Sequence, residues 1–190
     1  MFHPPAPMPH SPQILGIESS CDDSSLSLVQ LRDGIFQVDS LDTISQNSVH
    51  AQFGGVVPEL ASRAHLDALV KLVRQTPRQI FSQISAIAVS DTPGLPGSLV
   101  VGRSAATTLS QIFDRPVLPV DHIQSHIFSV LLERSFDQVP LPALVLTVSG
   151  GHSQIFLRTE NSSKFQTQLV ATTRDDAAGE ALDKVARLLG

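Results

Sequence analysis

The feature that most constrains this chain is a strand–turn–strand stretch between Ala143 and Leu157, ALVLTVSGGHSQIFL. Ala143 to Val148 is a continuous apolar run with the length of a buried strand, and Ser149-Gly150-Gly151 must turn the chain back onto Gln154 to Leu157. Adjacent glycines take positive φ freely and leave backbone N–H groups uncovered, so a phosphate can approach the turn. A hairpin turn without a ligand explains the same residues, and the pattern alone leaves both interpretations open.

A similar order of strand, polar turn and strand occurs near the N-terminus, where Ile14 to Ile17 and Leu26 to Val29 flank a polar run. Hydrophobic periodicity then predicts a third strand, followed by alternating helices and strands. The expected ranges are 34–45 (strand), 60–74 (helix), 84–90 (strand), 98–113 (helix), 117–120 (strand) and 122–133 (helix). After the second hairpin we expect a strand at 165–171 and a helix at 176–189. The predicted order is βββαβαβα and then βββα.

This order predicts the overall architecture. Two such units facing each other across a nucleotide are the plan shared by actin, sugar kinases and the Hsp70 ATPase. We therefore expect an α/β, actin-like fold with one complete lobe, residues 14–138, and the opening βββα of a second lobe, residues 139–190. Residues 1–13 hold five prolines and little that can be buried, which predicts a disordered tail.

Composition restricts the class of protein. The apolar runs are shorter than the roughly 20 residues that a membrane-spanning helix needs, and no signal peptide is evident, so we expect no membrane contact. The single cysteine, Cys21, fits the reducing cytoplasm. A net charge of −5 argues against a globally basic nucleic-acid binder, although a local patch can still contact phosphates.

A pair of histidines, His122 and His126, is the second chemical feature. Asp121 is the expected N-cap of the helix that carries them, and histidines one helical turn apart can hold one metal ion. Glu133 is about 10 Å further along the same helix and cannot complete the site. The third ligand must come from elsewhere, or the pair consists of ordinary histidines.

Two further stretches have the pattern of helix starts. In QFGGVVPELASRAH, Pro58 suits a first helical turn, and Glu59 and Arg63 are spaced for a solvated ion pair. In TRDDAAGEALDKVARLLG, Asp175 is the expected N-cap, and Gly179 in mid-helix costs about 1 kcal/mol relative to alanine, which indicates a close approach to the backbone. The apolar stripe of that helix comprises Ala178, Ala181, Leu182, Val185, Leu188 and Leu189.

Together these stretches resemble one family, the universal tRNA threonylcarbamoyladenosine transferases, formerly described as glycoproteases. The resemblance runs from Ile14 to Gly190. Its motifs occur in the family's order and spacing: LGIESSCDDSS, SQNSVHAQFGGVVPELASRAH, DHIQSH, TVSGGHS and DDAAGEALDKVARLLG. The implied reaction is transfer of the threonylcarbamoyl group from its adenylate to the exocyclic amine of the adenosine beside the anticodon, in tRNAs that read codons beginning with A.

The resemblance also implies site residues and partners. His122 and His126 match two histidines that bind a divalent ion, iron or zinc, and Asp183 matches an acidic residue that meets the ribose. The loop that cradles the adenylate phosphate corresponds to Thr147, Val148, Ser149, Gly150 and Gly151. The implied partners are threonylcarbamoyl-adenylate, tRNA, a paralogous actin-like subunit and an accessory ATPase. No residue is assigned as a general base.

The sequence departs from the family pattern in ways that bear on function. The family commonly has HHxEGH where this chain has DHIQSH, and its second lobe continues past LLG to a distant aspartate, the third metal ligand. We therefore expect the 190-residue chain alone to be inactive and to self-associate, because the 143–157 hairpin and the 178–189 apolar stripe would lack their usual cover. The alternatives are a non-catalytic actin-like partner subunit, which typically lacks the histidine pair, and an actin-like ATPase. A metallopeptidase would need a glutamate where Gln124 stands.

Overall fold

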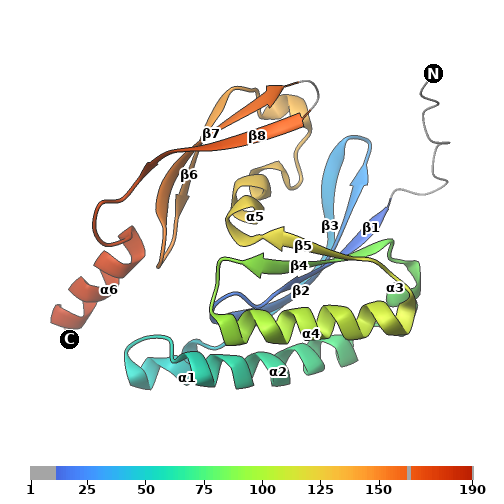
Figure 1. Ribbon diagram of the computed structural model, residues 1–190, viewed down its shortest axis with the longest axis horizontal. Coiled ribbons are helices and arrows are strands. Elements are labelled where there is room, and N and C mark those ends of the chain that lie inside the picture. The colour runs from blue at the N-terminus through green and yellow to red at the C-terminus, as the bar shows by residue number, and fades with distance from the viewer. Residues whose placement is uncertain (1–11, 162–163, 190) are drawn as a thin grey trace. The chain divides into compact units, whose positions relative to one another are not determined.

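The computed structural model describes residues 12–161 and 164–189 (Figure 1). The described chain forms two compact units that divide between Ser125 and His126. The disordered tail predicted for residues 1–13 falls almost wholly on residues 1–11, outside the described residues. The predicted boundary between the two lobes, after residue 138, stays a prediction. No helix in the described part of the chain is long and apolar enough to cross a bilayer.

The first unit contains a five-stranded mixed sheet in the order β3-β2-β1-β4-β5. Strands β1, β2 and β3 pair antiparallel, whereas β1–β4 and β4–β5 are parallel. The strand bounds are β1 Gln13–Glu18, β2 Asp23–Arg32, β3 Ile35–Ser45, β4 Ala86–Thr92 and β5 Val117–Asp121. An antiparallel βββ start that is followed by parallel strands confirms the predicted actin-like order.

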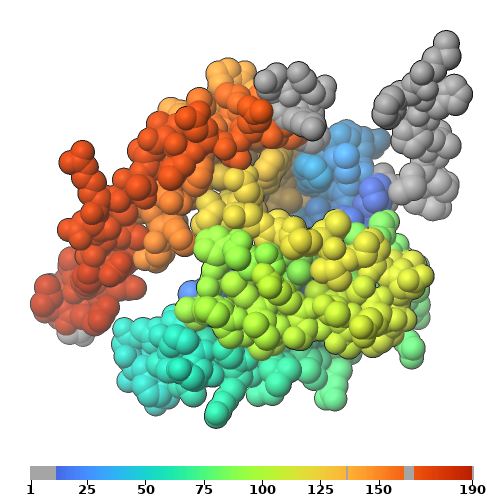
Figure 2. All heavy atoms as spheres, in the orientation of Figure 1, coloured from blue at the N-terminus to red at the C-terminus, as the bar shows by residue number. Residues whose placement is uncertain are grey.

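Helices cover one face of this sheet. Helices α2 (Pro58–Gln75) and α4 (Pro96–Phe113) lie side by side across it, and their side chains are in contact (Figures 1 and 2). The two helices approach closely where a Cβ on Gly97 would lie 2.3 Å from Ser62 Oγ. Shorter helices are α1 (Asn47–His50), η1 (Ala51–Phe53) and α3 (Arg78–Gln83). The core between sheet and helices contains Leu15, Ile17, Leu26, Leu28, Leu69, Leu72, Phe81, Ile84, Ile87, Val89, Ala106 and Leu109.

Two histidines in the first unit are structural. His65 is fully buried: its Nε2 lies 3.0 Å from the Cys21 carbonyl oxygen, and its Nδ1 lies 2.7 Å from Ser24 Oγ. A carbonyl only accepts, so Nε2–H donates to Cys21 and Nδ1 accepts from Ser24. His50 accepts from the Val57 N–H and donates to Gln46. His65 therefore fastens α2 to the β1–β2 connection, and His50 fastens the segment before α2.

The second unit contains the antiparallel sheet β6-β7-β8 and helix α6. Its elements are η2 Ser129–Leu131, η3 Phe136–Gln138, β6 Ala143–Val148, β7 Ser153–Asn161, β8 Lys164–Thr172 and α6 Ala178–Leu189. The opening βββα of a second lobe is thus present in the predicted order.

One local expectation is wrong, and the lack of cover expected for two apolar surfaces is found. The helix predicted at 122–133 ends earlier: α5 spans His122–Phe128, η2 follows, and Glu133 has a φ of 57°. Strand β6 is not buried on both faces, because Leu144, Leu146 and Val148 are exposed. The apolar stripe of α6 is exposed as well, with Leu188 86% accessible. Both apolar surfaces satisfy the sequence pattern without being packed within the described chain.

We expect His65→Ala to lower the free energy of unfolding by about 2–4 kcal/mol, since it leaves a buried hydroxyl and a buried carbonyl without their partner. The matched control is Leu66→Ala, because Leu66 is the next residue of α2 and is 56% exposed. That change should alter stability by no more than about 0.5 kcal/mol. Urea unfolding measures both, and equal losses would show that His65 has no special role.

Candidate functional site

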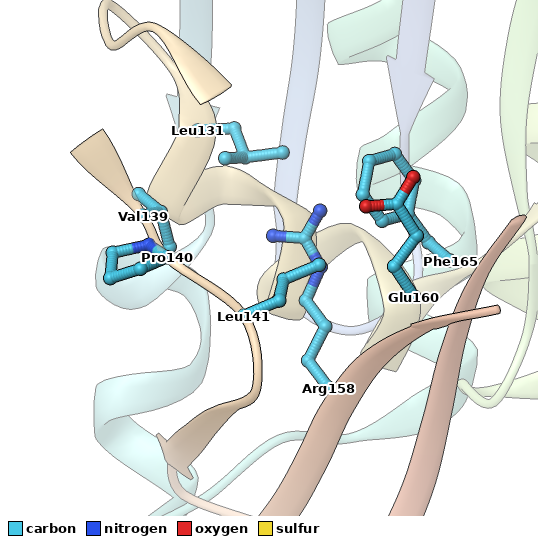
Figure 3. A pocket seen from close by; sticks show the side chains of 7 residues that line it. All are labelled: Leu131, Val139, Pro140, Leu141, Arg158, Glu160 and Phe165. Carbon is cyan, nitrogen blue, oxygen red and sulfur yellow. The ribbon is translucent and has the colours of Figure 1, made fainter. Parts of the chain in front are cut away.

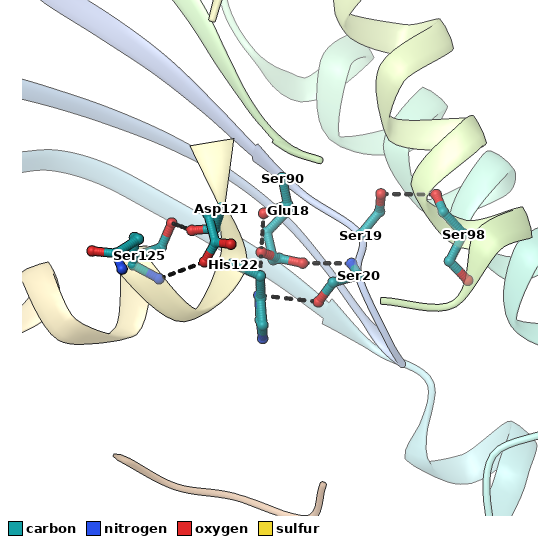
Figure 4. Close-up of polar contacts among 9 residues, drawn as sticks. Glu18, Ser19, Ser20, Ser90, Ser98, Asp121, His122 and Ser125 are labelled. Atoms are coloured by element: carbon teal, nitrogen blue, oxygen red, sulfur yellow. Dashed lines mark hydrogen bonds and ion pairs between the residues drawn. The ribbon is translucent and has the colours of Figure 1, made fainter. Parts of the chain in front are cut away.

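A polar cluster lies where three parallel strands of the first unit end. Glu18 is the last residue of β1, Ser90 lies near the end of β4, and His122 directly follows β5. Because Ile17 pairs with Val89 and Val89 with Pro119 in the parallel registers, these side chains meet at one edge of the sheet (Figure 4). Ligands of open α/β sheets bind at the carboxyl ends of the strands.

Glu18 is the centre of this cluster. His122 Nδ1 lies 3.1 Å from Glu18 Oε2, the Ser90 hydroxyl donates to the same oxygen, and the Ser20 N–H donates to Oε1 at 2.5 Å. Burial opposes ionisation of Glu18, but these hydrogen bonds outweigh it and lower the pKa of its carboxyl to about 2. The group is therefore a carboxylate at neutral pH, and it can only accept from His122.

His122 is oriented by this carboxylate. Its Nδ1–H donates to Glu18, and Ser20 Oγ lies 3.2 Å from the same nitrogen. The hydrogen bond to Glu18 raises the pKa of His122, while burial acts in the opposite direction. The other ring nitrogen, Nε2, points away from Glu18 (Figure 4). A histidine whose Nδ1–H is held by a carboxylate is the usual arrangement of a metal-ligating imidazole.

The histidine pair lies on one short helix. His122 and His126 are four residues apart on α5, and Asp121 Oδ1 accepts from the Gln124 N–H at 2.8 Å, which confirms Asp121 as the N-cap. Two imidazoles spaced four residues apart on a helix are donors that a metal ion accepts, and the metal site stays a prediction. Within residues 12–161 and 164–189, no group of three or more acidic, histidine or cysteine side chains is placed to hold an ion.

The second unit holds the predicted phosphate loop. Ser149 to His152 connect β6 and β7, and the loop is closed by Ser149 N–H to the His152 carbonyl at 2.7 Å and by His152 N–H to Ser149 Oγ at 3.0 Å. Neither Gly150 nor Gly151 has a positive φ, so the turn does not use the left-handed conformation that glycine permits. A Cβ on either glycine would meet nothing within 4 Å.

Helix α6 begins against this loop. The Gly179 N–H donates to the Ser149 carbonyl at 3.2 Å, and the Ala178 N–H donates to Ser153 Oγ at 2.9 Å. A Cβ on Gly179 would lie 2.8 Å from Gly150 Cα, which explains a glycine at this position; it lies in the first turn of α6 and not in mid-helix as expected. The close approach predicted there is confirmed, and the element that approaches is the loop itself. Asp175, the predicted N-cap, precedes α6 by more than one residue, so that expectation is wrong.

The predicted binding residues occupy distinct places around the loop. The side chain of Thr147 is buried and donates to the Gln154 carbonyl, whereas Val148 is exposed at the end of β6. Gly150 and Gly151 are exposed, and no hydrogen bond in the described part of the chain uses their N–H groups. Asp183 is exposed and lies four residues after Gly179, on the face of α6 that starts at the loop.

Sequence reasoning missed Glu18 and Ser20 as partners of His122, and Ser90 as a partner of Glu18. Polar residues that follow successive buried strands were the available signal, since parallel pairing brings such strand ends together. It also missed Ser149 and Ser153, which cap α6 from another element. The Glu59–Arg63 ion pair is absent from the described residues, whereas Lys184 pairs with Asp176 at 2.7 Å and with Glu180 at 3.1 Å.

Sheet order and the position of the cluster define an actin-like α/β protein with polar residues at the carboxyl ends of its strands. A model of the tRNA N6-adenosine threonylcarbamoyltransferase family matches residues 38–190. The chain is 45% identical over 177 residues to the tRNA N6-adenosine threonylcarbamoyltransferase of Mycoplasma pneumoniae, covering 93% of this chain and 53% of that protein. The chain belongs to this family.

Other similar proteins match over a comparable share of this chain. The tRNA N6-adenosine threonylcarbamoyltransferase of Koribacter versatilis is 46% identical over 183 residues, which cover 93% of this chain and 47% of that protein. The chain spans about half the length of the curated relatives it matches. Among solved structures, YeaZ from Pseudomonas aeruginosa has a TM-score of 0.49 at 16% identity, covering 87% of this chain and 72% of that chain.

We expect Gly179→Ala to destabilise the second unit by about 1–3 kcal/mol, because the added methyl group overlaps Gly150 even though alanine favours a helix. Gly151→Ala is the matched control, since a Cβ there meets nothing and its φ is not positive. Hydrogen exchange at the amides of α6 measures the difference. Unchanged exchange in Gly179→Ala would contradict the close packing of helix and loop.

Proposed function

We propose that this chain supplies the nucleotide-binding loop and the histidine pair of a tRNA-modifying acyltransferase. The reaction is transfer of a threonylcarbamoyl group from threonylcarbamoyl-adenylate to the exocyclic amine of the adenosine next to the anticodon, in tRNAs that read codons beginning with A. Family membership supports the reaction class. The observation that carries the proposal is the exposed Gly150-Gly151 backbone beside α6, with N–H groups that no protein acceptor in the described chain uses.

The loop suits the phosphate of an adenylate. The first N–H groups of α6 already donate to Ser149 and Ser153, so an incoming phosphate meets the N–H groups of Gly150 and Gly151 instead. The nearby start of α6 adds a favourable partial charge to an anion held at this loop. Asp183, on the adjoining helix face, supplies a carboxylate to a ribose hydroxyl. The same loop would stabilise the phosphate as it leaves during acyl transfer.

The histidine pair suits a divalent ion, iron or zinc. His122 and His126 would hold it, His122 through Nε2 because Nδ1–H is directed at Glu18. When bound, such an ion supplies Lewis-acid polarisation and a template for the acyl group. Glu18 fixes the ring orientation and tautomer of His122. We place the reaction in the cytoplasm. Its proposed partners are tRNA, a paralogous actin-like subunit and an accessory ATPase.

For the loop, we expect Gly150→Val to weaken AMP binding to the 190-residue chain by about tenfold or more, because the side chain covers the N–H groups that meet the phosphate. The fold should persist, since a Cβ there meets nothing within 4 Å. Asp183→Ala should weaken binding of AMP but not of inorganic phosphate. The control is Asp67→Ala, which removes the same charge from α2 in the first unit. Calorimetry that gives equal AMP affinity for Gly150→Val and the unmodified chain would exclude the loop.

For the metal, we expect weak Zn²⁺ binding that His122→Ala or His126→Ala abolishes and that Glu18→Gln weakens about 10–100-fold. His152→Ala is the control histidine and should bind normally. Metal retained stoichiometrically after dialysis by the double alanine variant would contradict the assignment.

Turnover is tested separately, by mass spectrometry of tRNA nucleosides. We expect modification with the chain joined to the C-terminal half of the Koribacter relative, and none with the 190-residue chain alone. Modification by the 190-residue chain would show that these residues suffice. A chimera that binds AMP but leaves tRNA unmodified would contradict the reaction while leaving the nucleotide site intact.

A further inference from the structure

A buried arginine in the second unit has no role in the sites described above. Arg158 extends from β7 and is only 1% exposed, the largest of the fully buried side chains. Its guanidinium carbon lies 4.7 Å from the ring centroid of Phe128 and 4.5 Å from that of Phe165. The rings cover the charge by cation–π contact, but they do not accept the N–H bonds in the guanidinium plane.

The hydrogen-bond donors of this guanidinium are not satisfied by the described chain. Nε and Nη1 of Arg158 are buried and have no acceptor, and no carboxylate of the described residues forms an ion pair with it. Burial lowers the pKa of Arg158, yet a guanidinium keeps its proton at any physiological pH. A buried charge without a counterion is costly, so this position suits an anion.

The guanidinium opens into a pocket of about 500 Å³. Leu131, Val139, Pro140 and Leu141 form an apolar wall, and Arg158 and Phe165 line the pocket with Glu160 (Figure 3). Figure 3 shows the guanidinium reaching in among these side chains. A volume of this size accommodates a small organic molecule. The pocket combines one cationic group with a mostly apolar enclosure.

Glu160 limits the charge of the occupant. It lies two residues after Arg158, on the same face of β7, and its side chain is exposed. Its carboxylate repels a doubly charged phosphate more strongly than a singly charged group. A monoanionic carboxylate therefore fits the charges of the pocket better than a phosphate does.

We propose that this pocket binds a small apolar carboxylic acid, with its carboxylate on the unpaired N–H groups of Arg158 and its hydrocarbon part against Leu131, Pro140 and Leu141. The pocket is built entirely from the second unit and is separate in its residues from the glycine loop and the histidine pair. Charge-assisted hydrogen bonds from a guanidinium to a carboxylate are among the stronger polar contacts in proteins.

The experiment titrates isovalerate into the 190-residue chain and follows the Arg158 side-chain and Leu131 methyl resonances by NMR. Isovaleramide, which has the same shape without the charge, is the matched ligand, and inorganic phosphate is the second. We expect isovalerate to bind at least about tenfold more tightly than either, because only it offers a monoanionic carboxylate on an apolar body. Equal affinities for isovalerate and isovaleramide, or no saturable shift with isovalerate, would overturn the proposal. Tighter phosphate binding would overturn the choice of a carboxylate.

Two variants assign the effect to the pocket. Arg158→Met keeps an unbranched stem between the two phenylalanine rings and removes the charge, so the preference for isovalerate over isovaleramide should vanish. Glu160→Gln removes the repulsive carboxylate from an exposed position and should tighten isovalerate binding about twofold or more. The second variant decides the matter if Arg158→Met fails to fold. Unchanged or weaker isovalerate binding by Glu160→Gln would overturn the proposal, because it would mean that Glu160 does not oppose an anion at Arg158.

Discussion

The hydrogen bond between Glu18 and His122 is the interaction on which the first unit's site depends. It joins residues 104 positions apart in sequence, and it exists because β4 lies between β1 and β5 in parallel register. Three donors hold Glu18 ionised despite its partial burial, so the carboxylate can fix the Nδ1–H tautomer of His122. His122 Nε2 is therefore the ring nitrogen left without a bond to Glu18, and the strand pairing that places Glu18 determines this as much as α5 does.

Small residues let the elements beside each site approach. A Cβ on Gly102 of α4 would lie 2.3 Å from Ser19 Oγ, and one on Gly94 would lie 2.7 Å from the Ser20 carbonyl oxygen. Gly94 and Gly102 therefore pack closely against Ser19 and Ser20, in the turn that follows Glu18. In the second unit Gly179 likewise allows a close approach, since it lets α6 begin directly against Ser149 and Gly150. Side chains at these positions would move the backbone on which the site residues are placed.

Glu18, which is half-buried, and Arg158, which is fully buried, contrast in how their charges are compensated. Glu18 receives hydrogen bonds from a histidine, a hydroxyl and a backbone N–H. Arg158 is covered by two aromatic rings and keeps two unused donor nitrogens. A charge with hydrogen-bond partners orients those partners, whereas a buried charge without them favours a ligand that supplies the missing acceptors and the opposite charge. The first case supports a positioning role and the second supports a binding role.

The sequence by itself determined the order of elements and much of their extent. Periodicity placed α2, α4 and the strands to within a few residues, and Asp121 before His122 was sufficient to predict the N-cap of α5, because these signals act over one or two helical turns. The apolar periodicity of α6 was also evident, but whether it is buried depends on other elements, and the structure leaves it exposed. Only the tertiary structure decided that Glu18 meets both Ser90 and His122, that α6 is capped by Ser149 and Ser153, and that Arg158 is buried between two phenylalanines. Each of these contacts links segments that strand pairing or helix packing brings together, and no local pattern encodes the pairing that puts them within hydrogen-bond distance.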